Sequence, residues 1–496
     1  MRFNVLIGGE AGLGPNLLTE ILGRVLVERG YYVFYSRDYQ SLIRGGHNFN
    51  VLTFSEEPVN SNDSKVDILV CLDAKTEEIH QKNLNISAVI LKGSKENMYY
   101  AGRLFKMLCL DFSILDRELK KLGKRYEENL KNAKQGYEEE KKEVCKILDK
   151  KKKNYFMNGN KGISEGAKKS GIEIYYAYPM TPATPVLGEL AENQLKENRL
   201  VVELENEIAV ANAGVGSCIA GKKVMVGTSG GGFDLMTETL SLCGIAEIPL
   251  VFYLSMRPGP GTGVATYTAQ GDLNIARHAG HGEFPRVVLA PGDPEESIEL
   301  TNSSFYFSHK FKVPSIIVSD KHLGESWYCF KEMPKLEKIK VETKLSRFNS
   351  YEVDKEGSAT EDAEQINKNI LKRKEKYLEI KKEAEKFEMF KTYGNKNSKN
   401  VVVSWGSPKG AILDAIKDLN ICFVQVLYIE PFSEKIEDLI KDKNIILVEN
   451  SATGLIGDLI KEKTGIKIKE ENKILRFDGR PFFADELKKE IEEKMR

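Results

Sequence analysis

Short apolar runs rich in β-branched residues alternate with helix-like stretches of small residues in the middle of the chain. The apolar runs predict buried strands at Val201–Leu204, Lys223–Gly227 and Pro249–Leu254. The segments Glu207–Ala220 and Phe233–Ile245 between them predict helices. This alternation is typical of a parallel sheet with right-handed crossovers. Ligands bind such sheets beyond the carboxyl ends of the strands, so we expect a site where these strands end.

The N-terminal part shows the same alternation. Residues 3–7 predict a short strand, and the glycine-rich stretch Gly8–Gly14 leads into a predicted helix at Pro15–Arg29. A glycine-rich turn at a helix N-terminus can hold an anion, which makes Gly12 and Gly14 candidate contacts. The spacing lacks the Gly-x-Gly-x-x-Gly fingerprint of dinucleotide-binding domains. A tight turn is the preferred interpretation, and a nucleotide-binding oxidoreductase stays as an alternative.

A second candidate anion site follows in the loop Arg44-Gly45-Gly46-His47. The loop combines a cation, a flexible backbone and an imidazole. It can bind an anionic ligand or form an ordinary structured turn, and the residues alone leave both interpretations open.

Two charged segments separate the patterns of alternating strands and helices. Residues 113–153 carry one weak apolar stripe, which predicts a solvated helical arm or linker closing the first domain. Residues 331–398 lack strand patterning and contain a charged helix near Glu361–Phe390. A further α/β unit follows, with strands expected at Val401–Trp405, Cys422–Leu427 and Ile445–Glu449.

Length and charge constrain the class of protein. A chain of 496 residues holds about three domains; the expected segments are 1–153, 154–330, a linker at 331–398, and 399–496. The 73 basic and 73 acidic side chains balance, so no net field favours nucleic acid or anionic lipid. No apolar run is long enough to span a bilayer, and the N-terminus begins like a strand rather than a signal peptide.

The seven cysteines are dispersed, without a Cys-x-x-Cys pair. An odd, scattered set is typical of buried thiols in a reducing cytoplasm, which is the expected location. It also argues against an iron–sulfur cluster or a structural zinc held by this chain alone.

Five stretches of the middle segment resemble the α subunit of the 2-oxoacid:ferredoxin oxidoreductases. The specific feature is a Tyr-Pro-x-Thr-Pro element followed by an Arg-x-Gly-Pro-x-Thr-Gly element. The five stretches are Tyr178-Pro-Met-Thr-Pro182, Glu205-Asn-Glu207, Thr228-Ser-Gly-Gly231, Arg257–Thr266 and Gln270-Gly-Asp-Leu273. Gly8–Gly14 and the Arg44–His47 loop resemble the γ domain of the same family, fused in front. Trp405-Gly-Ser and Gly479-Arg-Pro-Phe482 extend the resemblance to the C-terminal part.

The resemblance implies an α/β protein with three folded parts. These are a γ domain, a parallel-sheet domain that binds the pyrimidine side of thiamine diphosphate, and a C-terminal α/β domain similar to that of transketolase. Members of the family bind thiamine diphosphate between two subunits and decarboxylate a 2-oxoacid. They pass electrons through iron–sulfur clusters to ferredoxin and release an acyl-coenzyme A.

The resemblance also implies roles for single residues. Glu207 matches the catalytic carboxylate beside the aminopyrimidine ring, where burial lets such a group share a proton. Its alternative role is that of an acidic residue at a helix N-terminus. Thr181, Arg257 and Thr266 match substrate contacts, because a guanidinium can pair with a carboxylate through two hydrogen bonds. The implied cofactor contacts are Tyr178, Pro179, Thr181, Glu207, Ser229 and Gly230.

The motifs for the other half of such a site are missing from the sequence. No Gly-Asp-Gly motif places a metal and diphosphate, and no cysteine motif holds a cluster. In multi-subunit relatives both belong to a β subunit, so the resemblance implies Mg²⁺ and [4Fe-4S] clusters on a separate β chain. The glycines of Thr228–Gly232 are then expected to let the backbone approach the cofactor or this partner.

The stretch Arg257–Glu283 most resembles the 2-oxoglutarate subgroup of the family, which implies 2-oxoglutarate as the substrate. Candidate cations for its distal carboxylate are Arg277, His278 and His281. Pyruvate, branched-chain and aryl 2-oxoacids remain open. The substrate loop departs from the family pattern, because Gly261 replaces a serine and Ala265 replaces a proline. A non-catalytic partner subunit therefore stays as an alternative. Coenzyme A is the implied second substrate, and its candidate contacts are Gly12, Gly14, Arg44 and His47.

Overall fold

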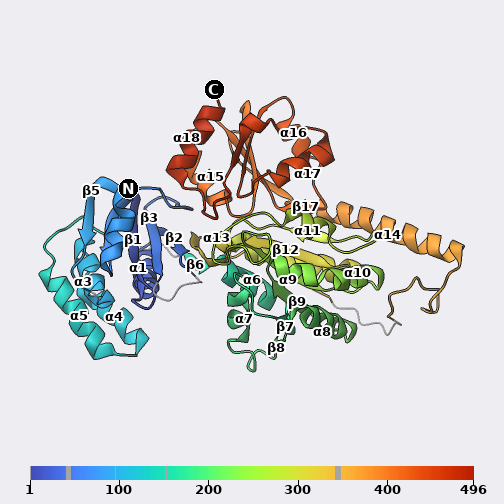
Figure 1. Cartoon of the computed structure of the whole chain (residues 1–496), viewed down its shortest axis with the longest axis horizontal. Helices are drawn as coiled ribbons and strands as arrows, with labels where there is room; N and C mark the ends of the chain where they lie inside the picture. The colour runs from blue at the N-terminus through green and yellow to red at the C-terminus, as the bar shows by residue number, and fades with distance from the viewer. Residues whose placement is uncertain (1, 41–45, 95, 151–153, 341–347) are drawn as a thin grey trace. The chain divides into compact units, whose positions relative to one another are not determined.

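The computed structural model describes residues 2–40, 46–94, 96–150, 154–340 and 348–496. The chain divides into two compact units (Figure 1). The first unit comprises residues 1–157, 326–332 and 483–487, and the second comprises the rest.

A seven-stranded mixed sheet forms the centre of the first unit. Strand β1 (Arg2–Glu10) pairs antiparallel with β3 (His47–Ser55) and parallel with β4 (Val66–Cys71). β1 is longer than predicted and takes in Gly8 and Gly9, so the glycine-rich turn is shorter than expected. The strand order is β5 (Leu84–Leu91), β4, β1, β3, β2 (Tyr32–Asp38), β13 (Trp327–Phe330) and β6 (Tyr155–Asn158). The helices are α1 (Pro15–Glu28), α2 (Ala74–His80), η1 (Gln81–Asn83), α3 (Asn97–Met107), α4 (Phe112–Leu122) and α5 (Tyr126–Glu139).

The prediction of a solvated arm at residues 113–153 is wrong. Leu115 and Leu119 of α4 are fully buried in the core of the first unit. Helix α5 packs closely against α3, because a Cβ atom added to Gly102 would lie 1.9 Å from the Ala133 carbonyl oxygen. These helices carry many charged residues on their outer faces and only a narrow apolar stripe on the buried face. The sequence pattern therefore indicated a solvated segment.

The second unit contains a seven-stranded sheet that is parallel except at one edge. Its order is β17 (Tyr428–Glu430), β11 (Val287–Leu289), β12 (Ser315–Asp320), β10 (Val251–Met256), β9 (Val224–Thr228), β7 (Ile174–Ala177) and β8 (Leu200–Glu203). β17 comes from the C-terminal part and pairs antiparallel with β11. The predicted strands and their parallel arrangement are confirmed, with ends shifted by one or two residues. The prediction that all three are buried is wrong for β8, because it is an edge strand and its side chains are exposed or only partly buried.

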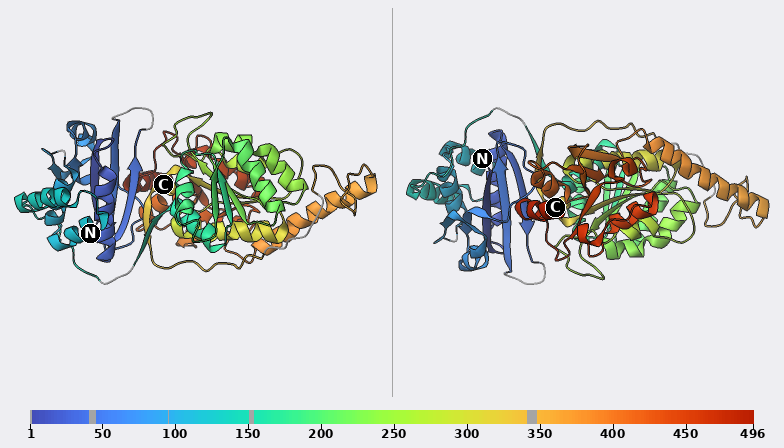
Figure 2. Two further views of the ribbon diagram at one scale, coloured as in Figure 1. Left: turned by 90° about the horizontal axis from the view of Figure 1, so that it is seen from below. Right: turned by 90° about the horizontal axis from the view of Figure 1, so that it is seen from above.

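Helices cover both faces of this sheet (Figure 2). Side chains alternate along β10, with Phe252 and Leu254 in one cluster and Val251 and Tyr253 in another. The first cluster includes residues of α8 (Glu207–Ile219), α9 (Gly230–Leu235), α10 (Thr237–Ile245) and α11 (Leu273–His278). The second includes residues of α6 (Gly159–Lys169), α7 (Thr184–Ala191) and α12 (Pro294–Phe311). Two-sided cover leaves the ends of the strands as the accessible part of the sheet.

A third sheet lies in the C-terminal part of the second unit, with the order β14 (Phe390–Gly394), β16 (Cys422–Val426), β15 (Asn400–Trp405), β18 (Asn444–Glu449) and β19 (Lys473–Leu475). β14 pairs antiparallel with β16, so the absence of strands predicted for residues 331–398 is wrong. This half-buried edge strand has too few residues to give a clear pattern. The remaining helices are α13 (Lys321–Glu325), α14 (Ala363–Ala384), α15 (Lys409–Ala415), α16 (Ile436–Ile440), α17 (Leu455–Thr464), η2 (Glu470–Asn472) and α18 (Ala484–Lys494).

A buried ion cluster joins the last two sheets. The Lys409 ammonium group pairs with Asp293 and lies 2.6 Å from Glu296 Oε1. Gln425 Nε2 donates to the other oxygen of Glu296 at 2.7 Å. Burial alone would raise the pKa of Glu296, but Lys409 and Lys391 lower it to about 2. The cluster is therefore charged at neutral pH and fixes one sheet against the other.

Candidate active site

Four of the predicted site residues lie beyond the carboxyl ends of neighbouring strands. Thr181 follows β7, Glu207 follows β8, Ser229 follows β9 and Arg257 follows β10. These strands are adjacent in the order β10-β9-β7-β8 and run parallel. The topology therefore brings residues that are far apart in sequence to one edge of the sheet, as parallel strands require.

Glu207 begins helix α8 and points inward. The side chain of Asn206 caps the helix by accepting a hydrogen bond from the Ala209 amide at 2.9 Å. The Glu207 side chain is only 4% exposed, and its Oε1 atom has no hydrogen-bond partner among the described residues. A buried carboxylate oxygen without a partner is costly, which favours a ligand that donates a hydrogen bond to it.

Helix α9 forms the wall opposite Glu207. A Cβ atom added to Gly232 would lie 2.6 Å from Glu207 Oε1 and 2.1 Å from Thr228 Oγ1. Ser229, just before the helix, is fully buried, and its hydroxyl oxygen also lacks a partner among the described residues. The segment Thr228–Gly232 is the end of β9 and the first turn of a helix, which begins three residues before the predicted start at Phe233.

Arg257 reaches from β10 towards the loop after β7. Its Nη1 atom donates a hydrogen bond to the Thr181 carbonyl oxygen at 2.7 Å. Burial lowers the pKa of Arg257, while the charge of Asp272 opposes this shift. A partly buried guanidinium held in this way can form an ion pair with a substrate carboxylate and donate hydrogen bonds to it. Thr266 is 2% exposed in the loop after β10, so its hydroxyl group contacts a substrate only if the loop rearranges.

Asp272 is a titratable residue of the Gln270-Gly-Asp-Leu273 stretch, and the sequence indicated no role for it. Burial and the nearby Asp234 raise the pKa of its carboxyl group to about 6, against the lowering effect of Arg257. A Cβ atom added to Gly230 would lie 2.5 Å from Asp272 Oδ2. The carboxyl group therefore lies against the start of α9, at the same edge of the sheet.

The C-terminal part holds the loop that carries Asp272. The Gln270 amide donates to the Asn450 carbonyl at 2.7 Å, and the Asn450 amide donates to Gln270 Oε1 at 2.8 Å. Gln270 Nε2 donates to the Trp405 carbonyl at 2.8 Å. Arg480 lies over the Tyr267 ring at 3.8 Å from its centroid. These contacts give the third sheet a direct part in shaping the candidate site.

The other two predicted cofactor contacts and the predicted distal cations have different surroundings. Tyr178 is 40% exposed, and Pro179 beside it is partly buried. Arg277 is buried, and its Nη2 atom donates to both carboxylate oxygens of Glu462 at 2.8 and 2.7 Å. His281 contacts the Ser241 hydroxyl group. Arg277 is thus already paired in this structure.

The glycine turn and the His47 loop belong to the first unit. Gly12 and Gly14 have φ angles of 99° and 79°, and no atom lies within 4 Å of a Cβ added to Gly12. His47 Nε2 lies 2.9 Å from His80 Nε2. Burial lowers the pKa of both imidazoles, that of His80 to about 4, so the pair is neutral at pH 7. Arg44 lies outside the described residues.

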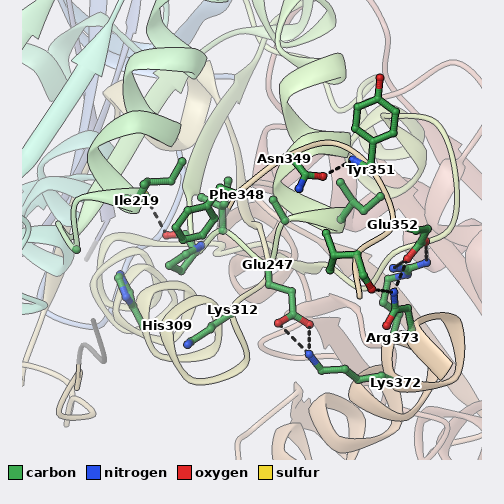
Figure 3. A pocket seen from close by; sticks show the side chains of 18 of the residues that line it. Ile219, Glu247, His309, Lys312, Phe348, Asn349, Tyr351, Glu352, Lys372 and Arg373 are labelled. Atoms are coloured by element: carbon green, nitrogen blue, oxygen red, sulfur yellow. Dashed lines mark hydrogen bonds and ion pairs between the residues drawn. The ribbon is translucent and has the colours of Figure 1, made fainter. Parts of the chain in front are cut away.

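A cavity of about 230 Å³ lies at the opposite edge of the second sheet, near the segments that enter β9 and β10 (Figure 3). Four of its charged lining residues pair with one another: Lys372 with Glu247 at 3.0 Å, and Arg373 with Glu352. None of the predicted site residues lines this cavity.

Two features are absent from the part of the chain that the structure describes. No group of three or more His, Cys, Asp or Glu side chains is placed to hold a metal ion there. Within the same residues, no helix has both the length and the apolar character needed to cross a bilayer.

Comparisons with known proteins find matches over most of the chain. Residues 165–397 match the thiamine diphosphate-binding family of pyruvate flavodoxin/ferredoxin oxidoreductase, and residues 4–97 match the pyruvate ferredoxin/flavodoxin oxidoreductase family. A 2-oxoacid:ferredoxin oxidoreductase subunit alpha from a Sulfolobus species is 28% identical over 99% of this chain and 96% of its own. A 2-oxoglutarate synthase subunit KorA from Archaeoglobus fulgidus is 37% identical over 34% of this chain and 49% of its own.

A solved structure shares the fold of the whole chain. It is a 2-oxoglutarate:ferredoxin oxidoreductase from Magnetococcus marinus with 2-oxoglutarate, coenzyme A and succinyl-CoA bound. It superposes with a TM-score of 0.89 at 21% identity and covers 100% of both chains. With both family models and the full-length relatives in agreement, the chain belongs to the 2-oxoacid:ferredoxin oxidoreductase family, as a chain of the α-subunit type.

Proposed function

We propose that this chain is the γ–α fused subunit of a coenzyme A-acylating 2-oxoacid:ferredoxin oxidoreductase that acts on 2-oxoglutarate. The reaction converts the 2-oxoacid and coenzyme A to acyl-coenzyme A and CO₂, and ferredoxin takes the two electrons. The observation that carries the proposal is the buried, unpartnered Glu207 carboxylate oxygen at the same sheet edge as Arg257 and Thr181. In the predicted organisation, residues 1–153 are the γ part, 154–330 the cofactor part, 331–398 a linker and 399–496 the C-terminal part.

Residues of this chain fit the pyrimidine side of thiamine diphosphate. Glu207 Oε1 and Ser229 Oγ are buried polar atoms without partners in the described structure, and Gly232 lets the Glu207 carboxylate lie directly against helix α9. Bound there, the cofactor would supply a carbon nucleophile for the keto group and an acceptor for the electrons freed as CO₂ leaves. Glu207 would hold a proton shared with a ring nitrogen. Arg257 would pair with the substrate carboxylate, held in place by the Thr181 carbonyl.

The proposed partner is a β chain that carries a Gly-Asp-Gly motif with Mg²⁺ and [4Fe-4S] clusters. The lack of these motifs in this sequence supports that division. Support for 2-oxoglutarate comes from relatives named 2-oxoglutarate synthase subunits. The Sulfolobus relative is named only for 2-oxoacids, so pyruvate and branched-chain 2-oxoacids are the alternative substrates.

The test is anaerobic co-expression with the candidate β chain, followed by coenzyme A-dependent reduction of methyl viologen. We expect reduction with 2-oxoglutarate and less with pyruvate or 2-oxoisovalerate. Glu207→Gln should abolish turnover while the complex still assembles, because the amide cannot share the proton. Glu205→Gln is the matched control, since Glu205 is exposed two residues earlier. Turnover that survives Glu207→Gln contradicts the catalytic assignment. A complex loaded with cofactor and clusters but inactive on every acid favours a non-catalytic subunit.

A further inference from the structure

Asp272 occupies the capping position of helix α11 but does not cap it. Aspartate at this position usually accepts a hydrogen bond from a backbone amide two or three residues later. Here the side chain makes no capping hydrogen bond. Its carboxyl group turns instead towards Gly230, where the missing Cβ atom leaves room for it. In this orientation helix α11 has no side-chain cap at Asp272. The acid lies instead beside Gly230, where the parallel strands of the second unit's sheet end.

Two charged groups from other elements act on Asp272. Arg257 follows β10 and attracts the ionised carboxyl group, whereas Asp234 of α9 repels it. Glu207, at the start of α8, lies against Gly232 of the same helix, two residues from the position where Asp272 meets Gly230. Asp272 therefore interacts with one cation and one other acid. A change in the charge of Asp272 therefore acts on the substrate position through Arg257.

The position of Asp272 is set from outside its own helix. Gln270, two residues earlier, is fully buried and makes three hydrogen bonds to Asn450 and Trp405 of the C-terminal part. A loop fixed in this way keeps the carboxyl group close to Gly230. Precise placement of this kind is what a group needs if it is to act on a neighbouring charge.

We propose that Asp272 is a positioning residue that acts through Arg257: it competes with the substrate carboxylate for Arg257 and takes up one proton from solvent when a 2-oxoacid binds. This inference rests on the proposed function. In the free site the ionised Asp272 offsets part of the Arg257 charge. A bound 2-oxoacid places a second carboxylate beside Arg257, and two like charges in a partly buried site favour protonation of one of them. No covalent bond forms or breaks in this step.

The direction of the pH dependence follows from this linkage. Below pH about 6 Asp272 is neutral, so Arg257 is free for the substrate. Above that pH a proton must be taken up with each substrate, so binding weakens as the pH rises. Uptake of one whole proton weakens binding by about tenfold per pH unit. We expect a smaller effect, about three- to tenfold in KM between pH 6 and 8, because Asp272 is only one of several charges in the site.

The experiment measures KM and kcat for 2-oxoglutarate with the assembled complex from pH 6 to 8.5. We expect KM of the wild type to rise with pH and KM of Asp272→Asn to stay low and flat. Asp234→Asn is the matched control, because it makes the same chemical change at an exposed residue of α9. In this variant KM should still rise with pH, but the rise should begin at lower pH, because Asp234 raises the pKa of Asp272. A KM that does not change with pH in the wild type, or an equal rise in Asp272→Asn, overturns the inference. If no acid is turned over at any pH, the proposed function itself fails.

Calorimetry gives a readout that does not depend on turnover. N-oxalylglycine, an unreactive analogue of 2-oxoglutarate, is titrated into the complex at pH 7.5 in two buffers that differ in ionisation enthalpy. We expect uptake of up to about one proton per site in the wild type and in Asp234→Asn, and none in Asp272→Asn. Binding without proton uptake in the wild type refutes the linkage. This measurement also covers the case in which Asp272→Asn fails to assemble.

Discussion

Replacing Gly232 by alanine should reduce turnover by about one to two orders of magnitude. The added Cβ atom would lie 2.6 Å from Glu207 Oε1 and 2.1 Å from Thr228 Oγ1, whereas ordinary contact begins near 3.4 Å. The carboxylate must therefore withdraw by at least about 0.8 Å. A displacement of about 1 Å in a reacting group costs about 100-fold in rate. The assay is coenzyme A-dependent dye reduction by the complex, with kcat and KM measured separately.

Gly231 provides the matched control for this substitution. It lies next to Gly232 on the same helix, and a Cβ atom there meets only the Gly261 carbonyl oxygen at 3.8 Å. Gly231→Ala should leave kcat unchanged and stabilise α9 slightly, because alanine favours a helix by up to about 1 kcal/mol over glycine. The reasoning is refuted if Gly232→Ala keeps wild-type kcat, or if both variants lose activity equally.

Two further predictions concern stability. Lys409→Met should lower the free energy of unfolding of the second unit by about 3–5 kcal/mol, because it leaves the buried Glu296 carboxylate and the partly buried Asp293 carboxylate without this partner. Chemical denaturation followed by Trp fluorescence measures the change, and an unchanged midpoint contradicts it. Burial lowers the pKa of His80 to about 4, below the value of about 6.5 in an unfolded chain. Its contribution to stability is therefore complete above pH 6.5 and decreases as the pH falls towards 4, by up to about 1.4 kcal/mol per pH unit. Thermal unfolding of His80→Gln should show a weaker pH dependence than the wild type over this range, and an identical dependence would exclude the effect.

The sequence predicts the parallel sheet of the second unit well because inner strands such as β9 and β10 are buried on both faces. The runs at Val201–Leu204, Lys223–Gly227 and Pro249–Leu254 lie within one or two residues of β8, β9 and β10. Helix α8 ends one residue before its predicted end. Continuous apolar runs bounded by small residues carry this information locally. The carboxyl-edge location of the candidate site follows from the parallel arrangement alone.

The pairings between distant segments could not be predicted in the same way. β13 joins the sheet of the first unit, and β17 joins the parallel sheet of the second. Each has only three or four residues, and nothing in so short a run identifies its partner. The orientation of Asp272 has the same origin. It depends on the contacts of Gln270 with Asn450 and Trp405, about 140–180 residues along the chain.

Two of the three glycines at the start of α9 accommodate neighbouring side chains, a use that the sequence did not indicate. The sequence suggested that they let the backbone approach a cofactor or a partner. In the structure Gly230 makes room for the carboxyl group of Asp272, and Gly232 makes room for that of Glu207, while Gly231 faces open space. Successive residues of a helix point about 100° apart, so positions two apart face very different directions. One short helix can thus keep two acids apart, one beside Arg257 and the other at the proposed cofactor position. Gly230→Ala and Gly232→Ala should then affect different kinetic constants: the first should alter the pH dependence of KM, and the second should lower kcat.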